Sequence, residues 1–326
     1  MTQTSAQPVV RNLAVPGATL QYEVRGDGPV LAVIGSPMTA SEFAELADAL
    51  AVDHTVVTYD PRGLGASPID DPAQDSTPEL RADDVAAILD DLGAGPADVF
   101  GSSGGAVTGL ALAARYPGWV RTLVAHEPPL LELLPASEAA EQRAATRDII
   151  ATFHSDGPGA AMAKFMATAG FEQSEDGTPV QPGPPPSSDE MAGQLADLSR
   201  FFNHELLCTT TYVPDLEALR ASRVIVGIGA DSEPLITHGT SLALCRLLGV
   251  EPVTFPGDHG GFMSAPAEFA DALRAVTADC RSAHPGDRRA VEIVEADLTT
   301  ADGVARVADG VSTLDGLVHC AGVADL

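Results

Sequence analysis

The chain has 326 residues, of which 45% are hydrophobic, so it can bury a sizeable core, and disorder along its whole length is excluded. Its formal net charge of −28 disfavours nucleic acid and anionic membrane surfaces, because clustered Lys and Arg bind both. The N-terminus lacks a basic-then-apolar signal, and no apolar run approaches the about 20 residues of a membrane span. We therefore expect an acidic cytoplasmic protein; its oligomeric state is left open.

The cysteines also limit the chemistry of the chain. The four of them are far apart and form no Cys-x-x-Cys pair: Cys208, Cys245, Cys280 and Cys320. This spacing supports neither a structural zinc site nor a disulfide framework. We therefore expect no metal and no cofactor in a reduced protein.

In residues 1–126, short apolar runs alternate with longer segments of helical periodicity, which is typical of a mainly parallel sheet with helices on both faces. The predicted strands are Asn12–Val15, Thr19–Val24, Val30–Ile34, His54–Tyr59, Ala97–Phe100 and Trp119–Ala125. The predicted helices are Ser41–Ala51 (with Ser41 as N-cap), Thr77–Leu92 and Ala106–Tyr116.

The pattern changes over residues 127–221, which we interpret as a helical insertion. Three helices are predicted there: Ser137–Phe153, Gly159–Ala169 and Asp189–Leu207, with a Pro/Gly-rich loop over 177–188. The strand–helix alternation resumes over residues 222–281 and completes the α/β core. Its elements are Val224–Ile228 and Pro252–Phe255 as strands and His238–Leu248 and Pro266–Thr277 as helices. Residues 282–326 form a linker and a tail that resembles part of a different unit.

A Gly-x-Ser-x-Gly motif carries the strongest chemical signal. It reads Gly101-Ser102-Ser103-Gly104-Gly105 and lies between a predicted strand and a predicted helix. A sharp turn there would raise the Ser103 hydroxyl above the sheet and place it at a helix N-terminus, where developing negative charge is favoured. The spacing selects Ser103 over Ser102 as the nucleophile. A glycine-rich phosphate loop or a plain tight turn is the alternative interpretation.

A serine hydroxyl needs a base, and His259 is the best candidate among eight histidines. It lies in a glycine-rich loop, Gly257-Asp258-His259-Gly260-Gly261, between the last strand and the last helix predicted in the α/β core. The glycines on both sides would let the ring turn toward Ser103. The other histidines lack this setting and are interpreted as surface or core residues.

The base in turn needs a carboxylate that fixes its tautomer. We choose Asp231, which follows the strand Val224–Ile228 and gives the chain order Ser, Asp, His. Glu233 is a fallback, and Glu127, after the strand Trp119–Ala125, is a second one. Asp258 adjoins His259 in the chain and is badly placed to reach its Nδ1 atom.

An oxyanion hole requires two backbone N–H donors. Gly104, directly after the nucleophile, is expected to supply one. The other is expected from the loop after Val30–Ile34; because Pro37 has no N–H, Ser36 is preferred. An ordinary loop is the alternative.

Taken together, these motifs resemble the α/β-hydrolase superfamily over roughly residues 12–280. The residues that carry the resemblance are Val33-Ile34-Gly35-Ser36-Pro37, Tyr59-Asp60-Pro61-Arg62-Gly63-Leu64-Gly65-Ala66-Ser67, Gly101-Ser102-Ser103-Gly104-Gly105 and Gly257-Asp258-His259-Gly260. The family's usual His-Gly is Ile34-Gly35 here. The resemblance implies an α/β-hydrolase fold with an eight-stranded, mainly parallel sheet and a helical cap over 127–221. A serine at position 103 argues against the branches that use an aspartate nucleophile.

The tail resembles the middle of a short-chain dehydrogenase/reductase. The matching residues are Glu295-Ala296-Asp297-Leu298-Thr299 and Leu314-Asp315-Gly316-Leu317-Val318-His319-Cys320-Ala321-Gly322. The glycine-rich nucleotide loop that should precede them is absent, so the pyrophosphate of a dinucleotide has no cradle. We therefore predict that this chain binds no dinucleotide.

The expected function is a serine hydrolase that cleaves an apolar, small or medium ester or lactone through an acyl-enzyme. Perhydrolysis, acyl transfer and C–C cleavage use the same triad and stay open, and a non-catalytic binding module ranks last. Apolar residues of the insertion are expected in part to line the pocket and in part to pack against the core: Phe153, Met162, Phe165, Met166, Phe171, Met191, Phe201, Phe202 and Tyr212.

Overall fold

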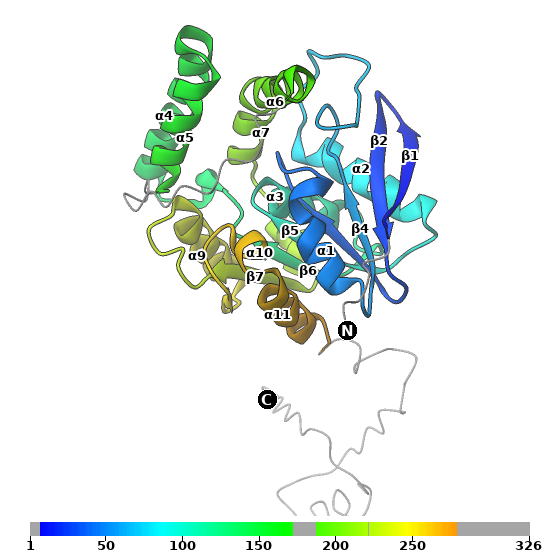
Figure 1. The fold of residues 1–326 in the computed structure, drawn as a ribbon. Helices are drawn as coiled ribbons and strands as arrows, with labels where there is room; N and C mark the ends of the chain where they lie inside the picture. The colour runs from blue at the N-terminus through cyan, green and yellow to red at the C-terminus, as the bar shows by residue number, and fades with distance from the viewer. Residues whose placement is uncertain (1–6, 172–186, 221, 279–326) are drawn as a thin grey trace, which may run out of the picture. The chain divides into compact units, whose positions relative to one another are not determined.

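The computed structural model describes residues 7–171, 187–220 and 222–278 (Figure 1). Its centre is an eight-stranded sheet in the order β1-β2-β4-β3-β5-β6-β7-β8. The first two strands pair antiparallel with their neighbours, and all pairs from β4 to β8 are parallel. The strands are β1 (Val9–Val15), β2 (Ala18–Arg25), β3 (Val30–Ile34), β4 (Thr55–Tyr59), β5 (Ala97–Ser102), β6 (Val120–His126), β7 (Val224–Gly229) and β8 (Val253–Phe255).

Helices cover both faces of this sheet, and β3 shows why its sequence is apolar throughout. Leu31 and Val33 belong to one hydrophobic cluster, whereas Ala32 and Ile34 belong to the other. Successive side chains of a strand point to opposite faces, so a strand buried on both sides needs an unbroken apolar run. One face carries α1 (Ala44–Leu50), α10 (Gly261–Ser264) and α11 (Pro266–Ala278); the other carries α2 (Pro78–Asp91), α3 (Gly104–Arg115), α8 (Leu216–Arg220) and α9 (Ile236–Leu248).

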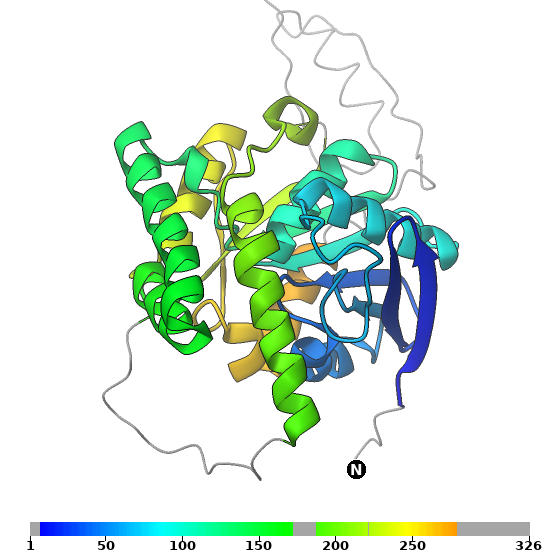
Figure 2. The same cartoon turned by 90° about the horizontal axis from the view of Figure 1, so that it is seen from above.

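Between β6 and β7 the described residues of the chain contribute helices and no strand. We call residues 131–220 the helical segment. Figure 2 shows α4 and α5 side by side, with α6 running into α7 as a second arm. Its elements are the 3-10 helix η2 (Leu131–Leu133), α4 (Ala136–Asp156), α5 (Pro158–Ala169), α6 (Ser188–Arg200), a π-helix η3 (Phe201–Glu205), α7 (Leu206–Thr210) and α8.

The structure differs from the predicted elements in two informative places. The single helix predicted over 189–207 is interrupted by the π-turn of η3, where the N–H of Leu206 donates to the carbonyl of Phe201. The helix predicted from Ser41 begins instead as a 3-10 turn, η1 (Ala40–Phe43), whose N-cap is Thr39. Thr39 forms a capping box with Glu42, which satisfies two of the otherwise unpaired amides of a helix start.

The predictions for the tail, the loop and membrane spans can be compared only with the described residues. The dehydrogenase-like tail, residues 282–326, and most of the predicted loop 177–188 lie outside the described residues. Within the described ranges, no helix is both long and apolar enough to cross a bilayer.

Candidate active site

Ser103 lies at the tight turn between β5 and α3, as the motif predicts. Its backbone has φ +55° and ψ −122°, which is an uncommon conformation for a residue with a side chain. Ser103 is the N-cap of α3, and its own N–H donates to the carbonyl of His126 at the end of β6 (2.9 Å). The turn is therefore anchored to the neighbouring strand, and its hydroxyl stands at the start of a helix.

Close packing explains the flanking glycines of this turn. A Cβ atom at Gly101 would come within 2.5 Å of the carbonyl oxygen of Gly105, and one at Gly105 within 2.2 Å of the carbonyl oxygen of Ile34. Both distances are shorter than any real Cβ contact, so the backbone could not keep this path with side chains there. The two glycines are thus required by the elbow itself.

His259 lies in the loop between β8 and α10, at the same edge of the sheet as Ser103. Its ring stacks on that of His126, with centroids 6.2 Å apart, and meets Phe171 of the helical segment edge-on at 5.8 Å. Ser103 and His259 line one cavity. The structure therefore brings the predicted nucleophile and the predicted base to one site.

The carboxylate paired with His259 is Glu127, the second fallback of the sequence analysis, and not Asp231, its first choice. His259 Nδ1 lies 2.6 Å from Glu127 Oε2. Glu127 directly follows β6, the strand beside β5, so its side chain starts one strand away from Ser103. Because a carboxylate can only accept, Nδ1 carries the proton and Nε2 is left as the basic atom.

Further hydrogen bonds fix the Glu127 carboxylate, which is fully buried. The N–H of Gly229 donates to Oε1 at 2.8 Å, and the hydroxyl of Thr237 donates to Oε2 at 3.0 Å. Burial by itself would raise the pKa of Glu127, but the hydrogen bond from His259 and the nearby histidine charges lower it to about 2. The group is therefore a carboxylate at any physiological pH.

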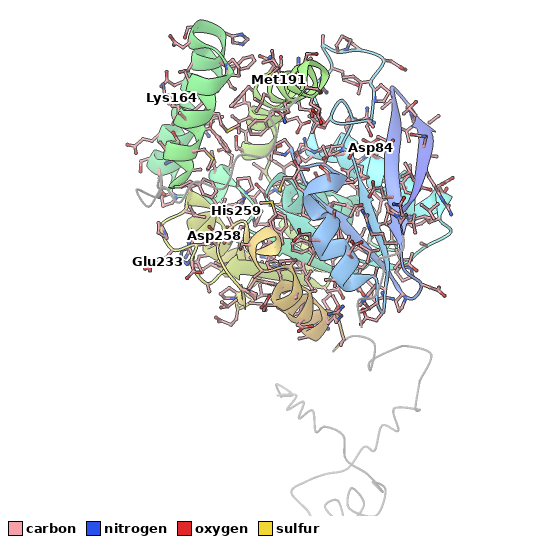
Figure 3. All side chains as sticks on the ribbon, viewed as in Figure 1. Asp84, Lys164, Met191, Glu233, Asp258 and His259 are labelled. Carbon is pink, nitrogen blue, oxygen red and sulfur yellow. The ribbon has the colours of Figure 1, made fainter. Side chains whose placement is uncertain are left out.

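The rejected carboxylates point elsewhere. The side chains of Asp231 and Glu233 are exposed, and Asp231 lines a separate hollow together with Asp258. In Figure 3 Glu233 lies at the outer edge of the molecule, beyond Asp258 as seen from His259. The N–H of Asp231 donates to the carbonyl of Gly257 (3.0 Å), so Asp231 steadies the histidine loop through its backbone.

Ser103 and Glu127 share a backbone peculiarity. In the part of the chain that the structure describes, they are the two non-glycine residues with positive φ, +55° and +51°. Each such conformation costs about 1 to 3 kcal/mol, and it persists where the surrounding structure enforces it, often at a functional site. Strain at these two residues marks the site independently of the motif.

The predicted oxyanion donors Ser36 and Gly104 lie against each other. A Cβ atom at Gly104 would come within 2.6 Å of the Ser36 carbonyl oxygen and 3.1 Å of its hydroxyl. Both residues line the cavity beside Ser103. The loop after β3 and the start of α3 therefore converge next to the hydroxyl of the nucleophile candidate.

The helical segment supplies more than half of the residues that line this cavity, and its surface is mostly apolar. The cavity measures about 90 Å³. Three of the aromatic residues expected in the pocket line it: Phe165, Phe171 and Phe201. Phe153, Met162 and Phe202 instead pack inside the helical segment, while Met166 and Met191 are exposed.

The chain also matches a known family. The sequence model of the alpha/beta hydrolase family covers residues 30–272. The protein belongs to the alpha/beta hydrolase family. This assignment confirms the predicted fold class, and the chain is a hydrolase of that type.

Individual relatives of this alpha/beta hydrolase agree with the assignment. An uncharacterized hydrolase of Bacillus subtilis, YraK, is 32% identical over 269 residues, which is 80% of this chain and 93% of the relative. A hydrolase from Pseudomonas aeruginosa has a similar structure (TM-score 0.64, 22% identity, covering 82% of this chain and 98% of that one). So does a thermophilic esterase from Thermogutta terrifontis (TM-score 0.63, 22% identity, 84% and 99%). These two likenesses show the fold.

No group of three or more His, Cys, Asp or Glu that could hold a metal ion occurs among the described residues of this hydrolase. Behind the pair Glu127–His259 lies the buried His126. His126 Nδ1 lies 3.4 Å from the hydroxyl of Ser102, and its ring contacts Phe100, Phe255 and Phe269.

His126 is expected to make folding sensitive to mild acid. Burial lowers the pKa of His126 from 6.5 to about 4, against the opposing effect of the Glu127 charge. Between pH 6.5 and pH 4, His126 is therefore protonated in the unfolded chain and neutral in the folded chain. The free energy of unfolding should therefore fall by about 3 kcal/mol between pH 6.5 and pH 4 through this residue. Urea unfolding at both pH values should show a smaller fall for His126→Phe, and an equal fall would contradict the prediction.

Proposed function

We propose that this hydrolase cleaves a carboxylic ester or lactone with Ser103 as nucleophile, His259 as general base and Glu127 as its partner. One observation carries the proposal: His259 donates from Nδ1 to the buried Glu127 while it shares a cavity with Ser103. The bond fixes the tautomer in which Nε2 can accept the serine proton. The shared cavity and the chain order Ser103, Glu127, His259 support a serine–acid–histidine triad for acyl transfer.

The reaction follows from these positions. As Ser103 Oγ attacks the carbonyl carbon, Nε2 of His259 takes the hydroxyl proton, and Glu127 stabilises the imidazolium. The N–H groups of Gly104 and Ser36 donate to the developing oxyanion. Collapse of the tetrahedral intermediate transfers the proton to the leaving alkoxide and leaves an acyl-enzyme. A water that gives its proton to Nε2 then releases the acid and restores the serine.

The helical segment acts in this proposal as a cap that selects the substrate. Cap residues supply most of the cavity wall, including Ile149 of α4, Phe165 of α5 and Leu206 of α7. In the described part of this wall, His259 is the one titratable side chain. The substrate is accordingly an uncharged ester whose apolar group fills a small space.

Reaction with a fluorophosphonate probe tests the nucleophile directly. The wild-type protein should form one covalent adduct, which peptide mass spectrometry should assign to Ser103 and not to its neighbour Ser102. The Ser102 hydroxyl is fully buried and faces His126, so it cannot reach the probe. No labelling of the folded protein, or an adduct on Ser102, would overturn the proposal.

Acyl-group charge is expected to control activity. Methyl pentanoate and monomethyl glutarate have five-carbon acyl groups that differ by a terminal carboxylate. We expect kcat/KM to be at least about 100-fold lower for the glutarate, because a carboxylate in an uncharged cavity loses about 3 kcal/mol or more of hydration. Acid release measured at constant pH gives both values; equal values would show that the acyl group lies outside this cavity.

A further inference from the structure

A buried carboxylate of the helical segment reaches the proposed oxyanion loop. The hydroxyl of Ser36 donates to Oε2 of Glu205, at 2.9 Å. These residues are 169 positions apart and are 3% and 1% exposed, respectively. The contact joins the loop after β3 to the last residue of the π-turn η3, and both partners are shielded from water.

The same carboxylate is linked to the second proposed donor. Arg81 of α2, which is fully buried, places Nη1 3.8 Å from Glu205 Oε2. Its Nε donates to the Thr108 hydroxyl (3.0 Å), and that hydroxyl donates to the carbonyl of Gly104 (3.1 Å). Glu205 therefore lies at the meeting point of two short chains of contacts, one to Ser36 and one to Gly104.

The position of Glu205 in the chain adds a link to the substrate cavity. Phe201 begins the π-turn, and Leu206 directly follows it; both line the cavity. Isolated π-turns are uncommon and occur often at functional sites. Thr209 of α7 also lines the cavity and accepts a hydrogen bond from Arg81 Nη2 at 2.8 Å. One short segment thus contributes to both the cavity proposed for the acyl group and the network behind the proposed oxyanion hole.

Stability does not explain a carboxylate at this place. Oε1 of Glu205 is buried with no hydrogen-bond partner, and burial raises the pKa of Glu205 against the lowering effects of Arg81 and Ser36. A buried ion pair with an unsatisfied oxygen is often no more stable than an apolar replacement. A role in placing Ser36 accounts for the observed contact.

The geometry points to Glu205 as a positioning residue. Through Ser36 and Arg81 it holds the oxyanion loop in a fixed position relative to the part of the cap that lines the cavity. The inference rests on the proposed function of Ser103. Glu205 touches neither the substrate nor the reacting atoms. It acts by fixing the backbone N–H of Ser36 where negative charge develops.

Transition-state binding distinguishes positioning from a merely structural role. For Glu205→Gln we expect kcat to fall about 10-fold to 100-fold, because small misplacement of an oxyanion donor has effects of this size. KM should change little, and affinity for a trifluoromethyl ketone should fall in parallel with kcat/KM. Ser36→Ala, which keeps the backbone N–H, should cause a similar loss, and the double variant should be no worse than either single one.

A matched control is Asp98→Asn. Asp98 is also a fully buried carboxylate paired with an arginine, Arg121, but it lies near the start of β5, away from the Ser103 end. This variant should lower the melting temperature without changing the ratio of ketone affinity to KM. If Glu205→Gln lowers stability in the same way and leaves that ratio at the wild-type value, the positioning role is wrong.

Fluorophosphonate labelling separates this failure from failure of the proposed function. Slower labelling of Ser103 in Glu205→Gln than in wild type supports the positioning role. Labelling of both at one rate overturns that role and leaves the proposed function intact. If the folded wild-type protein is not labelled, both the proposed function and the positioning role are wrong.

Discussion

Glu127→Gln is expected to lower kcat about 10⁴-fold while the protein stays folded. The amide oxygen can accept from the N–H of Gly229, as Glu127 Oε1 does now. Its NH₂ group would then face His259 and donate to Nδ1, which moves the imidazole proton to Nε2. In that tautomer the histidine cannot accept the serine proton, and losses of about 10⁴-fold follow in the analogous change elsewhere.

Asp231→Asn is the matched control for this variant. Asp231 is exposed, and the hydrogen bond that it makes to the histidine loop comes from its backbone N–H. We expect its kcat and KM to stay within about twofold of wild type, as for an ordinary surface change. Steady-state kinetics of the two variants with a short ester decide the matter. A large loss in Asp231→Asn with an active Glu127→Gln would restore Asp231 as the acid partner.

Local sequence was sufficient for the parts of this molecule that depend on local physics. The strand Val30–Ile34 was predicted with its observed bounds because it is an unbroken apolar run with turn residues on both sides. Ser103 and His259 could be selected because glycines surround each of them. Such spacing reflects backbone crowding, which is a property of neighbouring residues.

The acid partner was predicted wrongly because its choice depends on a non-local feature. Asp231 and Glu127 both follow strands at the carboxyl edge of the sheet, and both lie between Ser103 and His259 in the chain, so chain order does not separate them. The deciding observation is spatial: the Glu127 carboxylate meets both the N–H of Gly229 and the ring of His259. A usable signal was nevertheless present. Glu127 is an acidic residue directly after a buried strand that adjoins the nucleophile strand.

Glu205 gave no such signal. It stands in Phe-Phe-Asn-His-Glu-Leu-Leu, where helical periodicity predicts a continuous helix and an unremarkable acidic residue. Only the fold brings residue 205 to Ser36 and Arg81, because the helical segment returns over the edge of the sheet. Long-range contacts of this kind set the parts of the site that local patterns do not encode.

The site as a whole uses the geometry of a parallel sheet. Ser36, Ser103 and Glu127 follow β3, β5 and β6, which are adjacent strands, and His259 follows β8. The carboxyl ends of parallel strands lie at one edge, so four separate loops meet there without any long excursion of the chain. The helical segment supplies most of the remaining cavity wall, so in the proposed mechanism the sheet edge holds the reacting groups and the segment selects the substrate.

Ser103→Ala should have the largest effect of any single change, a loss of about 10⁶-fold in kcat, because the covalent step disappears while the folded structure remains. Alanine removes only the hydroxyl, and residual hydrolysis would come from the oxyanion donors and binding. Its matched control is Ser102→Ala, one residue earlier.

Ser102 is fully buried, and its hydroxyl lies 3.4 Å from His126 Nδ1. Removing this hydroxyl should lower the stability somewhat and reduce kcat less than about tenfold. Burst kinetics with a p-nitrophenyl ester, normalised to folded protein, measure both; a burst that survives in Ser103→Ala and vanishes in Ser102→Ala would mean that the nucleophile is assigned one residue too late.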